Sequence, residues 1–128
     1  MTRRISRQEG QTMVEFALVV PILLVVVFGV IQFGVVYKDY VTLTDATRVG
    51  ARKAAVSRHE ANPVGAAVTA VRNSATGLDQ SQLAVAVGSS WQHGADVTVT
   101  ASYPYEIDLL GLVVAAGQLE STTTERVE

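Results

Sequence analysis

The stretch MVEFALVVPILLVVVFGVIQFGVVY, residues 13–37, decides the fold of this chain. From Phe16 to Ile31 no residue is polar, and as a helix the stretch can cross a bilayer core of about 30 Å. We therefore predict a single transmembrane helix over residues 11–37. Pro21 removes one backbone hydrogen bond within it and is expected to kink the helix nearby.

The flanking charges predict the orientation of this segment. Lys38 is followed at once by Asp39, whereas the leader in front is basic, with Arg3, Arg4 and Arg7. By the positive-inside rule the N-terminus is cytoplasmic and residues 38–128 lie outside. A secretory signal peptide also begins with positive charge, but its apolar core is usually only about 7 to 15 residues long. We therefore predict a cytoplasmic leader (1–10), the membrane helix and an extracytoplasmic domain (38–128).

Composition argues against several classes of function. The net charge of −2 comes with no basic stripe, so nucleic acid is not an expected partner. The chain has no cysteine, and His59 and His93 lie far apart, so neither a metal site nor a cofactor is expected. Ser57, His59 and Glu60 are too close in sequence for a catalytic triad and are interpreted as surface, so no enzyme is predicted. Trp91, in a loop, is interpreted as a half-buried plug.

The helical pattern continues beyond the membrane through YVTLTDATRVGARKAAV, residues 40–56. A stripe of mainly small side chains recurs at helical spacing, with Thr47 at its edge: Leu43, Ala46, Gly50 and Ala54. Small residues allow another helix to approach closely. Residues 14–57 are thus predicted to form one rod of about 65 Å, with Asp45 and Arg48 paired on its wet side.

A second helix is predicted after the break at residues 57–63. Asn62 suits the N-cap, Pro63 suits the first helical position, and Gly77 fits just past the end. The predicted buried face consists of Val64, Ala67, Val68, Val71 and Ala75. We expect this helix to pack antiparallel to the outer half of the first.

The last third of the sequence alternates as strands do. Strands are predicted over residues 83–87 and 97–103, with Pro104 ending the second, and a third over 119–127. The apolar run LLGLVVAA, 109–116, is too short to span a membrane. We interpret it as core or a short helix against the sheet, with an exposed docking patch as the alternative. The predicted fold is α+β: a long N-terminal helix, a second packed helix and a small antiparallel sheet.

Gly10, followed after four residues by Glu15 and Phe16 at the start of an apolar helix, resembles the N-terminus of TadE-like pseudopilins of tight-adherence (Flp-type) pilus systems. The stretches DATRVGARKAA (45–55) and LESTTTERVE (119–128) are similar to that family too. The resemblance implies a pilin-like fold and cleavage between Gly10 and Gln11 by a prepilin peptidase at the bacterial cytoplasmic membrane. The implied partners are membrane lipid, that peptidase, other pseudopilins and pilin subunits, and the inner-membrane pilus assembly platform.

Physical chemistry supplies a reason for each residue of the motif. Gly10 favours non-helical backbone, so the chain there is expected to lie extended in a protease cleft. Cleavage exposes an α-amino group on Gln11, about one helical turn from Glu15. In surroundings of low dielectric constant, the Glu15 carboxylate of one subunit and the Gln11 amine of a neighbour would attract strongly. The alternative is that Glu15 lies among lipid headgroups at the start of the helix.

The sequence therefore predicts a non-enzymatic pseudopilin that takes part in assembly of a tight-adherence type IV pilus, as a minor subunit or helper. A second hypothesis is an uncleaved bitopic scaffold that docks the pilus or secretion machinery through its outer domain. A third, a bitopic membrane enzyme or receptor, is disfavoured because the sequence offers no convergent set of polar residues.

Overall fold

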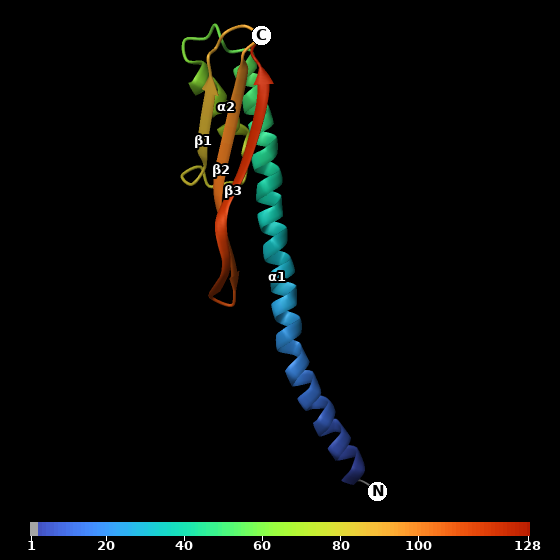
Figure 1. Ribbon diagram of the computed structural model, residues 1–128. Helices are drawn as coiled ribbons and strands as arrows, with labels where there is room; N and C mark the ends of the chain where they lie inside the picture. The colour runs from blue at the N-terminus through green and yellow to red at the C-terminus, as the bar shows by residue number, and fades with distance from the viewer. Residues whose placement is uncertain (1–2) are drawn as a thin grey trace.

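The computed structural model describes the backbone of residues 3–128 and the side chains of residues 8–128 (Figure 1). One long helix supports a small α+β globule on its C-terminal half, while its N-terminal half projects alone. The elements in chain order are α1 (Arg3–Ala55), α2 (Pro63–Ser74), β1 (Ala84–Ser89), β2 (Asp96–Leu109) and β3 (Leu112–Arg126). The predicted α+β class, with two helices and three antiparallel strands, is confirmed.

Helix α1 is the predicted rod, but it is longer at its N-terminal end. Its 53 residues correspond to about 80 Å, and it begins at Arg3 rather than near residue 14. The helix continues through Pro21 without interruption, and the ribbon curves in its blue N-terminal part (Figure 1). Arg52 and Lys53 occupy the last turn, where positive charge complements the helix dipole.

Helix α2 begins as the sequence predicts. The Asn62 side chain accepts a hydrogen bond from the backbone N–H of Gly65 at 2.9 Å, and Pro63 follows as the first helical residue. The helix ends at Ser74, earlier than the position of Gly77 suggests. Its buried residues are Ala67 and Val71, and the C-cap residue Ala75 is buried as well. Val68 is half-buried, whereas Val64 is exposed and the prediction that it is buried is wrong.

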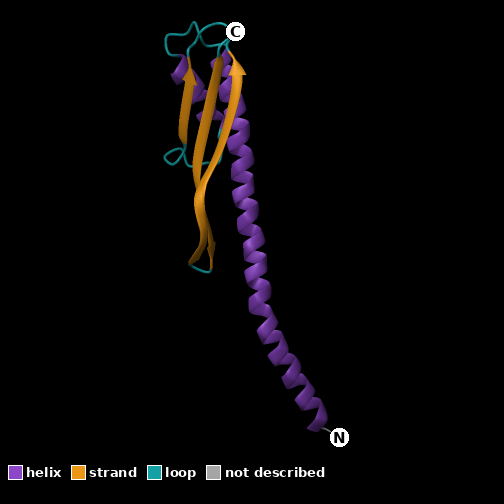
Figure 2. Ribbon diagram, in the orientation of Figure 1, coloured by secondary structure: helices purple, strands orange, loops and turns teal. Residues whose placement is uncertain are grey.

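The sheet has the order β1-β2-β3 with antiparallel pairing throughout. Its outer face carries hydrogen-bonded threonine pairs, Thr98 with Thr124 at 3.1 Å and Thr100 with Thr122 at 3.0 Å. Its inner face lies against the helices (Figure 2) and is apolar on β1 and β2. This alternation is why residues 97–103 could be recognised as a strand.

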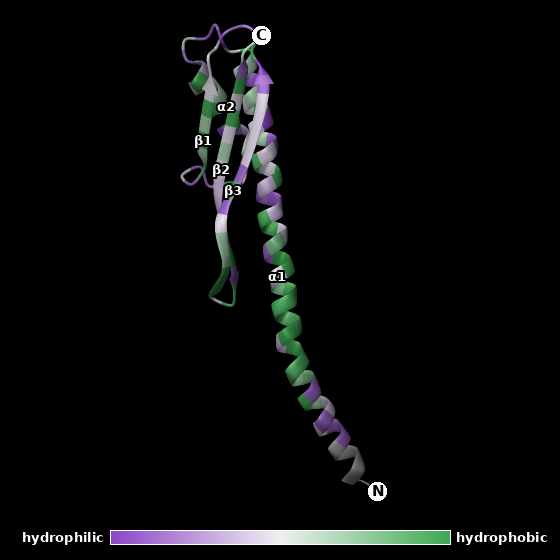
Figure 3. Ribbon diagram, in the orientation of Figure 1, coloured by the Kyte–Doolittle hydropathy of each residue, from purple (hydrophilic) through white to green (hydrophobic). Residues whose placement is uncertain are grey.

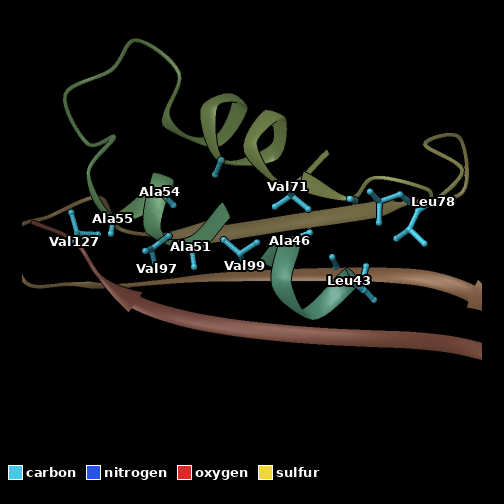
Figure 4. Packing of buried hydrophobic residues seen from close by; sticks show 14 residues of the cluster. Leu43, Ala46, Ala51, Ala54, Ala55, Val71, Leu78, Val97, Val99 and Val127 are labelled. Atoms are coloured by element: carbon cyan, nitrogen blue, oxygen red, sulfur yellow. The ribbon is translucent and has the colours of Figure 1, made fainter. Parts of the chain in front are cut away.

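The hydrophobic core lies between the sheet and the outer half of α1. Figure 4 shows Ala46, Ala51 and Ala54 of α1 close to Val97 and Val99 of β2. The buried apolar residues are Leu43, Ala46, Ala51, Ala54, Ala55, Ala67, Val71, Ala75, Leu78, Leu83, Val97, Val99, Ala101 and Val127. Because most of the helix side chains are alanine, the layers approach closely and the core is thin.

A small polar cluster ties β3 to α1 beside this core. Thr47, fully buried, places its Oγ1 3.2 Å from Ser121 Oγ and 3.2 Å from Thr123 Oγ1. The same hydroxyl donates to the Thr44 carbonyl. These hydrogen bonds satisfy a hydroxyl that would be costly to bury alone, and they set the position of β3 along the helix.

Two predictions about the sheet are wrong. Strand β2 does not end at Pro104 but continues to Leu109. Pairing with β1 stops at Ser102, so β2 has a free edge beyond that residue on which proline can be accommodated. The run 109–116 is neither core nor a short helix: it forms the end of a long β2–β3 hairpin and is largely exposed, as the alternative of an exposed patch requires.

Candidate functional site

The first candidate site is the N-terminal part of α1, around Gly10, Gln11, Glu15 and Phe16. Every side chain of residues 8–16 is exposed, and Phe16 keeps 69% of its surface. Helical periodicity gathers the polar residues Gln8, Gln11, Thr12 and Glu15 along one side. Glu15 is therefore the last polar residue of a stripe that leads into the apolar segment.

Glu15 and Gln11 contact one another directly. Gln11 Nε2 donates to Glu15 Oε1 at 3.1 Å, one helical turn apart. In the uncleaved chain the carboxylate thus has a neutral partner from its own helix. Cleavage after Gly10 would place a charged α-amino group on that same Gln11, beside the same carboxylate.

Gly10 lies inside helix α1, so the extended backbone predicted for Gly10 in a protease cleft stays a prediction. A Cβ added at Gly10 would meet no atom within 4 Å, so contacts with the described part of the chain do not explain the glycine. Glycine in a helix interior is less stable than alanine by about 0.5–1 kcal/mol. With no tertiary contact around it, this segment can unwind at low cost to enter a protease.

The remaining residues of the predicted N-terminal site stay predictions. The side chains of Arg3, Arg4 and Arg7 lie outside the described residues. Pro21 lies within the continuous part of α1. Neither the cleavage site nor the orientation signal is tested by the arrangement of the described chain.

The polar cluster after α1 is structural. Ser57 is fully buried rather than on the surface as predicted, and its Oγ donates to the Lys53 carbonyl and to Glu60 Oε1. Lys53 Nζ contacts the same carboxylate oxygen at 2.6 Å, and this hydrogen bond is the main reason that the pKa of Glu60 is lowered. His59 Nε2 accepts from Arg58 Nε at 2.9 Å, and among the described residues no hydrogen bond joins His59 to Ser57 or Glu60 as a triad would require.

A second titrating group organises the loop after α2. Ser81 donates both its hydroxyl and its backbone N–H to Asp79 Oδ1, and these hydrogen bonds lower the pKa of Asp79. Tyr103 accepts from the Asp79 backbone N–H at 3.1 Å. Within the described residues, no group of three or more His, Cys, Asp or Glu side chains is placed to hold a metal ion.

The predicted anchor has the properties that a bilayer requires. One helix of the described chain is long and apolar enough to cross a membrane, and none of its apolar window is buried by the rest of the chain. Most apolar residues of that segment are exposed, and Figure 3 shows the segment as the green stretch of α1. A surface of this kind fits a single-pass membrane anchor.

Two further predicted features are confirmed in the outer domain. Arg48 Nη1 lies 3.7 Å from Asp45 Oδ1 on the exposed side of α1. Trp91 is half-buried and packs against the core, with a positive φ of 56°. The exposed hairpin end, residues 109–116, differs most from prediction, because it was expected to be core or a short helix.

Comparison with known proteins agrees with the resemblance noted for the N-terminal part of the sequence. The family model described as TadE-like protein matches residues 10–52. That segment begins at the predicted cleavage glycine and ends inside α1, so it contains the apolar helix and the small-residue stripe but not α2 or the sheet. No curated protein and no solved structure matches the chain significantly.

Proposed function

We propose that this chain, a TadE-like protein over residues 10–52, is a non-enzymatic membrane-anchored pseudopilin, cut by a prepilin peptidase and used in assembly of a tight-adherence pilus. Residues 1–10 form its cytoplasmic leader, and residues 38–128 form its outer domain. Its partners are the peptidase, other pseudopilins and pilin subunits, and the inner-membrane assembly platform.

The main observation in support of this proposal is that the N-terminal half of α1 is apolar and is not covered by the rest of the described chain. A long apolar helix that its own chain leaves uncovered needs another apolar environment. Lipid supplies it before assembly, and the helices of neighbouring subunits supply it within a filament. A protein that moves between these two environments requires an anchor that is apolar on all sides, as this one is.

The position of Gly10 supports processing of this anchor. It lies in exposed helix, before the apolar segment and away from every tertiary contact of the described chain. A peptidase at the cytoplasmic membrane face could unwind this turn without disturbing the outer domain. The leader that it removes carries the arginines that orient the helix. Because these arginines are needed during insertion, cleavage follows insertion.

Glu15 then serves assembly. Its carboxylate already contacts Gln11 within one chain, and cleavage converts that residue into a cationic N-terminus. Between packed helices, where the dielectric constant is low, an ammonium and a carboxylate of neighbouring subunits attract more strongly than in water. A packing out of register would leave both charges unpaired, which is strongly unfavourable.

The alternative is an uncleaved bitopic scaffold that docks the pilus or secretion machinery through residues 38–128. The polar stripe that ends at Glu15 suits a helix that stays among lipid headgroups. In that case the carboxylate contributes only to the placement of the helix, and its removal has no effect on association with other subunits.

The test compares Glu15→Gln and Glu15→Ala with Glu9→Gln, a matched change to a carboxylate of the leader. Each variant is assayed in the host for cleavage and for cross-linking to pilin-like subunits. We expect both Glu15 variants to be cut but to lose cross-links, and Glu9→Gln to retain both.

Three results are separable. Parental cross-linking by both Glu15 variants would exclude the assembly role and support the headgroup alternative. Failure of cleavage in both would assign Glu15 to peptidase recognition. Absence of cleavage in the parent chain as well would favour the scaffold.

A further inference from the structure

The exposed end of the β2–β3 hairpin is the strongest surface feature that the proposed function does not use. Two strands extend beyond the core, past the end of β1, and are joined by Leu110 and Gly111. The apolar side chains at this end are exposed: Leu110 at 75%, Leu112 at 69%, Val113 at 50% and Val114 at 52%. Monomeric soluble proteins rarely leave a large contiguous apolar patch exposed.

The turn has a leucine, Leu110, at a position where a solvent-exposed turn favours asparagine or aspartate. Leu110 has φ 56° and Gly111 has φ 84°, which is the backbone of a two-residue hairpin turn with positive φ at both positions. Asparagine or aspartate is favoured at the first position because bulky side chains are strained there. The turn is stabilised by Asp108, whose Oδ1 accepts from the Gly111 N–H at 2.7 Å. A leucine at the most exposed point is therefore not explained by the geometry of the turn.

The height of the hairpin end along α1 follows from the polar cluster at Thr47. The Thr47–Ser121 contact fixes β3 on the helix, and β3 runs from Leu112 to this point in the same direction as α1. The strand from Ser121 back to Leu112 covers about 30 Å at about 3.3 Å per residue. The same distance along a helix takes about twenty residues. The hairpin end is thus level with α1 near Val27.

The figures agree with this estimate. In Figure 1 the hairpin end reaches down beside the middle of α1, well below the globule. In Figure 3 this end is green and is level with the green part of the helix. Two apolar surfaces far apart in the sequence therefore lie at one height.

Tyrosines mark a boundary between the apolar end and the rest of the sheet. Tyr105 pairs with Gly117, about 13 Å below Ser121 at about 3.3 Å per residue, which is level with α1 near Lys38 by the same calculation. Tyr37 and Tyr40 of α1 are exposed at this height. Tyrosine is enriched where membrane meets water. The tyrosines of both elements thus lie in one plane, where the sequence predicts that the membrane ends.

We propose that the end of the β2–β3 hairpin, residues 109–114, inserts into the outer leaflet of the membrane beside the α1 anchor. This rests on the proposed membrane anchoring of α1, because a rigid helix in the bilayer carries the hairpin end to that depth. Lipid is the occupant that the geometry favours, since residues 109–114 are level with the apolar part of α1, below the plane of the tyrosines. The hairpin and α1 then hold the outer domain at two points and fix its tilt on the membrane.

The test measures the depth of spin labels in the full chain, which has no native cysteine. Leu110→Cys places a label at the hairpin end, Phe28→Cys places one at the same height on α1, and Gln92→Cys places one in the exposed loop at the far end of the sheet. The protein is reconstituted in vesicles of phosphatidylethanolamine and phosphatidylglycerol at a high lipid-to-protein ratio. Collisions with oxygen, which concentrates in lipid, and with an aqueous nickel chelate are then compared.

We expect the labels at positions 110 and 28 to collide mainly with oxygen and the label at 92 mainly with nickel. A label at Val113 (Val113→Cys) should shift toward nickel when Leu110→Asn is added, because the apolar end is shortened while the turn is favoured. If position 28 is in lipid but 110 collides with nickel, the hairpin inference is overturned and the anchor stands. If 28 also collides with nickel, both fail. If 110 is shielded from both reagents, another protein surface covers it, and the lipid proposal is likewise overturned.

Discussion

The replacement Gly50→Ala tests the contact on which the fold of the outer domain depends. A Cβ built at Gly50 lies 2.2 Å from Val71 Cγ2 and 3.4 Å from the Ala67 carbonyl oxygen. Carbon atoms pack best at about 3.5–4.0 Å, so the new methyl overlaps Val71 by more than 1 Å. Val71 is fully buried and β-branched, so it cannot turn away without strain.

The expected change is the difference between two effects. Overpacking of this kind costs about 1–3 kcal/mol, and an overlap this large places it at the upper end. Alanine is a better helix former than glycine by about 1 kcal/mol. We therefore expect a net loss of about 2 kcal/mol in the free energy of unfolding. In a domain of this size that lowers the melting temperature by roughly 10 °C.

The assay is urea unfolding of residues 38–128, followed by the fluorescence of Trp91, the single tryptophan of the chain. Every buried apolar residue among the described side chains lies within this fragment, so we expect it to fold without the anchor. Val71→Ala in the Gly50→Ala background removes the overlapping methyl, so the double variant should lose less stability than the sum of the single ones. Gly88→Ala, whose new Cβ meets nothing within 4 Å, is the control. A Gly50→Ala fragment as stable as the parent would refute the close approach of α1 and α2.

Three further predictions follow from the chain. Gly10→Val should insert normally but keep its leader, because a β-branched side chain hinders entry to a protease cleft; a mature-sized band would contradict peptidase recognition there. A reporter active only in the cytoplasm, fused after Glu128, should be silent, and activity would reverse the predicted orientation. The lowered pKa of Glu60 adds stability that is complete above its ordinary value of 4.5 and is lost as pH falls through the lowered value. When the pH is lowered below 4.5, the urea midpoint of the parent should therefore fall more than that of Glu60→Gln, because only the parent has this carboxylate to protonate. Equal falls in the two midpoints would exclude the effect.

The helical half of the fold could be predicted because its signals are local. The small-residue stripe from Leu43 to Ala54 has the period of a helix, and the structure buries it as expected. Asn62 and Pro63 mark the start of α2 by capping chemistry alone. Val64 was misassigned because periodicity places it near the buried face, while the exposure of a first-turn residue depends on where the neighbouring elements end.

The hairpin could not be predicted because its length depends on pairing between distant residues. Pro104 ends a strand only if both edges of that strand are paired, and here β1 stops first. The run 109–116 has the composition of a core segment. Sequence alone does not distinguish an apolar segment that packs against protein from one that is exposed to another apolar environment such as lipid. Leu110-Gly111 is a weak turn signal, because two-residue turns of this type usually have asparagine or aspartate before the glycine.

The N-terminal site was predicted from the resemblance to TadE-like pseudopilins, and the structure adds its context. It brings Gln11 and Glu15 into contact, which follows from their separation by one helical turn. It also places Gly10 in helix, because nothing in the isolated chain forces the backbone to be extended. The extended conformation is expected only in a complex with the proposed peptidase, so the structure of one chain alone does not test it.

The most direct test of the account is the N-terminal sequence and intact mass of the protein isolated from membranes of its native host. A processed pseudopilin should begin at Gln11, with a mass lower than that of the full chain by residues 1–10. A protein that retains those residues while the host assembles its pili would contradict processing and leave the uncleaved scaffold as the function of this chain.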